Sequence, residues 1–136
     1  MRRIQMDGAT TFWSRFLGLM GKTKVDRPLW FPRCRSLHSF FMKMPIEVIG
    51  LANITQDKEK IRAMVVSQTV LLPWRTLVLS PHVDSVLECP VGYFEQAGFS
   101  VGQRCTITLT KRPYLFYQPF SKREGYLTYE EDHSEG

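Results

Sequence analysis

LHSFFMKMPIEV, residues 37–48, places a histidine and a carboxylate inside an otherwise apolar run. The pattern predicts two strands, residues 38–42 and 46–53, broken at Pro45. Strand alternation puts Glu47 between apolar neighbours on its own face. A carboxylate in such a place costs several kcal/mol unless it is paired or hydrogen-bonded. We therefore expect Glu47 to lie in or beneath a concavity, paired with His38 on the adjoining strand or with Arg75.

The segments on either side of this stretch also predict short strands. Val- and Thr-rich or alternating runs mark further strands at residues 61–72, 77–79, 83–89 and 104–110, and a polar hairpin connects 55–60. A helix is expected near residues 11–20, with Phe12, Phe16 and Met20 on one face, and a helical turn at 92–98 with a glycine stop. Many short strands with Gly and Pro turns indicate an all-β single domain, a sandwich or barrel with one or two short helices.

Three other segments connect this stretch to a known family. They are Arg15–Met20 (RFLGLM), Pro73-Trp74-Arg75 and Leu87-Glu88. Together with residues 37–48 they resemble the bacterial and archaeal family called domain of unknown function 192. The resemblance covers about residues 8–110 and implies a compact, jelly-roll-like β fold. The family has no established reaction, so the resemblance implies little about activity.

This chain departs from the family pattern in two places and extends beyond the resembled segment. Glu47 stands where the family usually has an aspartate, and Phe41 where it often has a tryptophan. We expect a β domain over residues 1–110 and a C-terminal extension over 111–136, aromatic at first and then acidic, with a frayed end. Tyr114, Phe116, Tyr117 and Phe120 in this extension are expected to pack rather than to recruit a partner.

Composition limits the classes of protein that remain. The chain has 136 residues, an apolar fraction of 43% and a net charge of +5, which is enough apolar content for one ordinary core. Its three cysteines have no paired spacing, so we expect buried thiols and neither a disulfide framework nor a zinc site. The basic residues are scattered and no nucleic-acid motif accompanies them, so we expect no nucleic-acid partner.

No segment approaches the ~20 apolar residues of a membrane span. The basic start has no apolar segment after it and does not match a signal peptide, although family members often carry an export signal or lipid anchor. We therefore expect a cytoplasmic protein. No motif calls for a cofactor, and a metal site built from His38, Glu47 and His82 has no supporting ligand spacing.

The candidate binding residues are His38, Glu47, Trp74, Arg75 and Glu88. We expect Trp74 to be substantially buried and to fix the turn that carries Arg75, and we assign no catalytic residue. A buried acid with a cation is commonly a fold-specifying cluster. The same residues also allow a module that binds a small molecule or peptide. The alternatives are a hydrolase-like enzyme with Glu47 as general base, and a scaffold or accessory protein without pocket chemistry.

Overall fold

Nine strands and one short helix make up the described part of the chain. The computed structural model describes residues 3–8, 28–40, 42–57, 60–110 and 123–129. Its elements are β1 (Arg3–Gly8), β2 (Leu29–Pro32), β3 (Ser36–His38), β4 (Ile46–Gln56), β5 (Lys60–Leu71), β6 (Thr76–Val78), β7 (Ser85–Cys89), α2 (Tyr93–Gln96), β8 (Arg104–Leu109) and β9 (Arg123–Tyr129).

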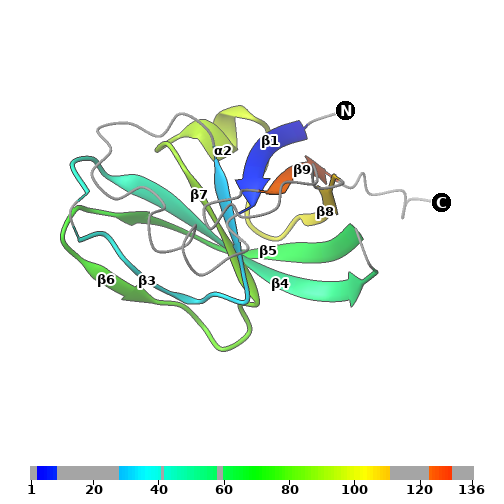
Figure 1. Ribbon diagram of the computed structural model, residues 1–136, viewed down its shortest axis with the longest axis horizontal. Coiled ribbons are helices and arrows are strands. Elements are labelled where there is room, and N and C mark those ends of the chain that lie inside the picture. Colours follow the sequence, from blue (N-terminus) through cyan, green and yellow to red (C-terminus); the bar gives the residue numbers. More distant parts are fainter. Residues whose placement is uncertain (1–2, 9–27, 41, 58–59, 111–122, 130–136) are drawn as a thin grey trace, which may run out of the picture.

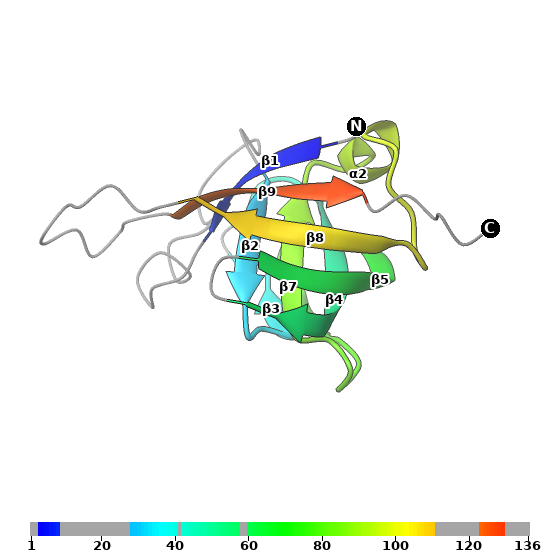
Figure 2. The same ribbon diagram turned by 90° about the vertical axis from the view of Figure 1, so that its right-hand side faces the viewer.

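Seven of these strands close into a barrel. Its order is β1-β2-β7-β4-β5-β8-β9, and β9 returns to pair with β1 (Figure 1). The β1–β2 pair is parallel and the other neighbours in the barrel are antiparallel. Figure 2 shows β8 and β9 crossing over the layer formed by β2, β7 and β4. The all-β, single-domain fold expected from the sequence is confirmed as this barrel.

The strands β2, β7 and β4 are buried on both faces. The first six residues of β4 and all five residues of β7 are buried. Alternation sends Ile49 and Leu87 into the barrel interior, the inner core, and sends Val48 and Val86 to a second cluster outside the barrel, the outer core. Burial on two sides explains why these segments are continuous apolar runs in the sequence.

Helix α2 contributes to the inner core. Phe94 is fully buried there and its ring stacks on Phe99 with a centroid distance of 5.3 Å. Phe99 in turn meets the ring of Tyr129 edge-on at 6.4 Å, so the helix, the following loop and β9 pack against one another. Gly98 has a φ of 92°, which favours glycine after a helix, as the expected glycine stop requires.

The outer core is covered by a two-stranded ribbon of β3 and β6. The ribbon pairs Leu37 with Leu77, and both side chains pack against the outer core. Gly50 of β4 allows this close packing, because a Cβ there would clash with Oγ of Ser67 and lie 3.0 Å from Cγ2 of Val83. Figure 1 shows the ribbon beside the barrel strands β4 and β5.

The structure differs from the sequence expectations at two strands. The strand expected over residues 38–42 is β3, which ends at His38. The β fold was expected to end at residue 110, but residues 123–129 form β9 and pair with β1 and β8. The helix expected near residues 11–20, the aromatic stretch 114–120 and the last residues fall outside the described ranges.

Candidate functional site

Glu47 is buried on the inner face of the barrel sheet, and no cation of the described ranges is paired with it. It lies on the inner face of β4, opposite Cys89 of β7, with 5% of its surface exposed. Its Oε1 atom has no hydrogen-bond partner within the part of the chain that the structure describes. The expected pairing is wrong, because His38 sits on β3, whose neighbour is β6, and the Nη1 atom of Arg75 donates to the carbonyl of Trp74 at 3.3 Å.

Glu88 lies on the opposite face of the same sheet. Its register partners are Leu29 of β2 and Val48 of β4, which belong to the outer core. Burial raises the pKa of the Glu88 carboxyl to about 8. Burial, with the charges of Glu47 and Glu88, also raises the pKa of the Cys89 thiol, which makes it a poor nucleophile. Glu47 and Glu88, which the sequence grouped in one candidate site, therefore lie on opposite faces of the sheet, Glu47 toward the inner core and Glu88 toward the outer core.

His38, Phe40 and Trp74 form an exposed row of rings at one end of the ribbon. The His38 and Phe40 rings stack with centroids 4.8 Å apart and planes 28° apart. The Phe40 and Trp74 rings are 6.0 Å apart with planes 31° apart. Trp74 is 54% exposed, so the expectation that it is substantially buried is wrong. Of the candidate residues, the structure brings together His38, Trp74 and, directly after it in the chain, Arg75.

A buried serine holds the backbone beneath these rings. Ser39 is fully buried, and its N–H donates to the carbonyl of Arg75 at 2.8 Å. The carbonyl of Ser39 accepts the N–H groups of Trp74 at 3.0 Å and Met42 at 3.1 Å. Its Oγ accepts the N–H of Arg75 at 2.8 Å and donates to the carbonyl of Leu72. Trp74 itself has a φ of 60°, a left-handed conformation that is rare for a bulky residue. The serine thus fixes the loop in which the tryptophan is strained.

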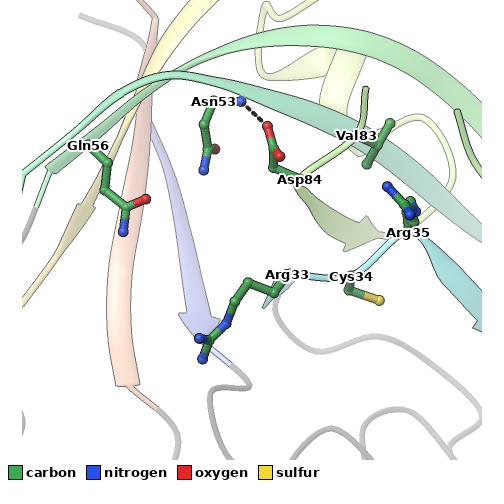
Figure 3. A pocket seen from close by; sticks show the side chains of 7 residues that line it. All are labelled: Arg33, Cys34, Arg35, Asn53, Gln56, Val83 and Asp84. Carbon is green, nitrogen blue, oxygen red and sulfur yellow. Dashed lines mark hydrogen bonds between the residues drawn. The ribbon is translucent and has the colours of Figure 1, made fainter. Parts of the chain in front are cut away.

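A polar pocket of about 510 Å³ lies at the ends of β2 and β4 and the start of β7. Figure 3 shows Asn53 and Gln56 on one side of it and Arg33 and Arg35 on the other. The described residues that line it are Arg33, Cys34, Arg35, Asn53, Gln56, Val83 and Asp84. In the register of β2, β7 and β4, this pocket is at the opposite end of the strands from Cys89 and helix α2.

The comparison with known proteins agrees with this architecture. The family model DUF192, described as an uncharacterised ACR, matches residues 1–107. The chain belongs to the DUF192 family. A UPF0127 protein of Pyrococcus furiosus is 36% identical over 107 residues, which span 75% of this chain and 85% of that protein. The family resemblance noted in the sequence is thereby confirmed.

A solved structure resembles this DUF192 member in fold. It is the crystal structure of a protein of unknown function from Novosphingobium aromaticivorans, with a TM-score of 0.51 and 20% sequence identity. The match covers 71% of this chain and 70% of that chain. At such identity the likeness shows the fold alone.

Two features are absent from the described ranges of this DUF192 protein. There, no helix is both long and apolar enough to cross a bilayer. No three His, Cys, Asp or Glu side chains gather in the same residues as a metal-binding group.

Several residues that matter to the DUF192 site were not singled out from the sequence. Ser39 has a detectable signal, because a small hydroxyl inside an apolar run commonly bonds to nearby backbone. Phe40 was assigned to a strand face and is an exposed ring in the loop instead. Arg33, Asn53 and Asp84 come from separate segments, and no local pattern links them.

The separation of Glu47 from Arg75 predicts an additive mutant cycle. We expect the effects of Glu47→Gln and Arg75→Met on the free energy of unfolding to add in the double variant within about 0.5 kcal/mol, since the two side chains share no contact. Urea unfolding midpoints of the wild type, the two single variants and the double variant measure this. A coupling energy above about 1 kcal/mol would contradict the separate placement.

Proposed function

We propose that this protein is a small binding module whose ligand contacts the aromatic row of His38, Phe40 and Trp74, with Arg75 beside it. The observation that carries the proposal is the state of Trp74, which is both exposed and held in a left-handed backbone conformation. Such a conformation costs about 1–3 kcal/mol and persists only where the surroundings impose it. A strained, exposed tryptophan supported by a buried serine fits a contact residue better than a packing residue.

The chemistry of the row indicates the class of ligand. Three rings in succession offer flat apolar faces, on which a planar group or an extended peptide can stack. The exposed guanidinium of Arg75 supplies a positive charge and a planar hydrogen-bonding fork. Tryptophan and arginine are also the residue types that most often dominate binding energy. The ligand is therefore a small molecule or peptide that combines a flat ring with a negative charge.

The geometry favours binding over hydrolysis by Glu47. A general base must reach the proton it removes, within about 2.6–3.2 Å or through one water molecule. Glu47 is 5% exposed on the inner face of β4, whereas the aromatic row lies at one end of the ribbon that covers the outer core. A scaffold without a ligand site would not need the strained tryptophan, and it remains the outcome if the experiment below finds no binding.

Trp74→Gly separates a binding role from a structural one. We expect its free energy of unfolding to stay within about 1 kcal/mol of the wild type, because glycine adopts positive φ without strain. We expect the same variant to weaken binding at least tenfold. The probes are 4-hydroxybenzoate and a short peptide of alternating glutamate and tyrosine, titrated while the backbone amide signals of His38, Phe40 and Arg75, which the variant keeps, are followed by NMR.

Val101→Gly is the matched control, because Val101 is 51% exposed and does not belong to the aromatic row. It should bind both probes as the wild type does. The same peptide with glutamine in place of glutamate tests the charge requirement and should bind more weakly. Failure of both charged probes to bind the wild type, or a loss of several kcal/mol of stability in Trp74→Gly, would overturn the proposal.

A further inference from the structure

Among its described lining residues, the pocket at the ends of β2 and β4 has an excess of positive charge. The charged ones in that part of the chain are the arginines Arg33 and Arg35 and the carboxylate of Asp84. Arg35 uses Nη1 to donate to the carbonyl of Pro81 at 3.1 Å, and its guanidinium has five N–H donors in all. Guanidinium groups bind carboxylates and phosphates through charge-assisted, often bidentate hydrogen bonds. The wall formed by residues 33–35 therefore suits an oxyanion.

The opposite wall offers neutral hydrogen-bonding groups. The side-chain amides of Asn53 and Gln56 extend from the exposed end of β4 beside the pocket (Figure 3). Each side-chain amide has two N–H donors and one acceptor oxygen. A ligand carboxylate can only accept hydrogen bonds and would leave the amide oxygens unpaired, so this wall suits ligand groups that both donate and accept. Hydroxyl groups have that property, whereas an apolar ligand would leave these amides unpaired.

The two walls are tied together through Asp84. Its Oδ2 accepts the N–H of Asn53 at 2.6 Å, its own N–H donates to the carbonyl of Leu51 at 2.8 Å, and its carbonyl accepts the N–H of Cys34 at 3.1 Å. Arg33, next to Cys34, has a φ of 50°, a conformation that residues other than glycine rarely adopt. A fixed arrangement of this kind lowers the ordering cost of binding.

We propose that this pocket binds a small polyhydroxylated molecule that carries one carboxylate or phosphate group. The arginines contact the oxyanion, and Asn53, Gln56 and Asp84 contact the hydroxyl groups. The volume of about 510 Å³ lies within the range of pockets that hold small molecules, about 300–1,000 Å³. The site is separate from the aromatic row, since the two share no residue.

Four probes test this combination of groups. D-gluconate and glucose 6-phosphate carry both hydroxyls and an oxyanion, D-glucose carries the hydroxyls alone, and acetate carries the charge alone. Each is titrated into the full chain, with binding read from backbone amide shifts in NMR. We expect at least one of the first two to bind tenfold or more tightly than glucose and acetate, with the largest shifts at Cys34, Asn53 and Asp84. The better of the two identifies the oxyanion.

Single variants then locate the site. Arg33→Gln should weaken binding of the better probe at least tenfold, and Gln56→Ala should weaken it about threefold or more. Arg104→Gln removes the same charge from an exposed position on β8 and should bind as the wild type does. Trp74→Gly should also leave this binding unchanged. Equal losses in Arg33→Gln and Arg104→Gln, or no binding of either polyol anion by the wild type, would overturn the proposal.

Discussion

Between about pH 4.5 and pH 8 the free energy of unfolding of the wild type is expected to fall by about 4–5 kcal/mol, and Glu88→Gln is expected to abolish this fall. Burial raises the pKa of Glu88 from 4.5 to about 8 in the native state. In that pH window the native carboxyl keeps a proton that the unfolded chain has already released. The unfolded state binds fewer protons there, so the free energy of unfolding falls as the pH rises, by about 1.4 kcal/mol per unit.

Glutamine has the size of the protonated acid and carries no charge at any pH. The variant should therefore lack this slope and exceed the wild type in stability at pH 9. Urea unfolding at intervals from pH 5 to pH 9 measures both curves. Glu95→Gln, at an exposed position on α2, is the control and should keep the slope of the wild type. Parallel curves for the wild type and Glu88→Gln would show that the native carboxyl titrates normally.

Phe94→Ala is expected to lower the free energy of unfolding by about 3–5 kcal/mol. The Phe94 ring is fully buried against Phe99, and its loss leaves a cavity in the inner core that the surrounding strands fill only in part. The midpoint of thermal or urea unfolding at constant pH measures the change.

Val91→Ala provides the control for Phe94→Ala, because Val91 precedes the same helix and is 51% exposed. Its effect should stay within about 0.5 kcal/mol. A small loss for Phe94→Ala, similar to that of Val91→Ala, would mean that the helix does not pack into the barrel as the structure has it.

The strands were predictable because their signals are local. The polar hairpin at residues 55–60, the long Val- and Thr-rich strand after it and the alternation at 104–110 each lie within one short window, and β4, β5 and β8 follow them closely. β9 was missed because Glu124 lies within it and Glu130, Glu131 and Asp132 follow it directly, so the composition from residue 121 onward is that of a polar, acidic chain end. Its own residues Gly125, Tyr126 and Leu127 do alternate, with Gly125 and Leu127 buried.

The candidate site was predictable only in part because it depends on pairing between distant segments. The face that Glu88 occupies follows from its register with Leu29 and Val48, which no local pattern contains. Trp74 was expected to be buried because it follows Pro73 in a turn that it was assumed to fix by packing. Its exposure follows from the left-handed backbone that Ser39 holds from a position 35 residues earlier in the sequence.

The pairing of β9 with β1 has a consequence for how the chain reaches its native state during synthesis. β1 meets β2 at two register positions but meets β9 at six, so the first described strand depends mainly on the last one. Until residues 123–129 have left the ribosome, β8 is an open edge and β1 lacks most of its partners. Contacts between such distant segments slow folding. The nascent chain therefore has an incomplete sheet until synthesis is nearly finished. Unpaired strand edges are prone to aggregation, so chaperones are most useful to the chain at this stage.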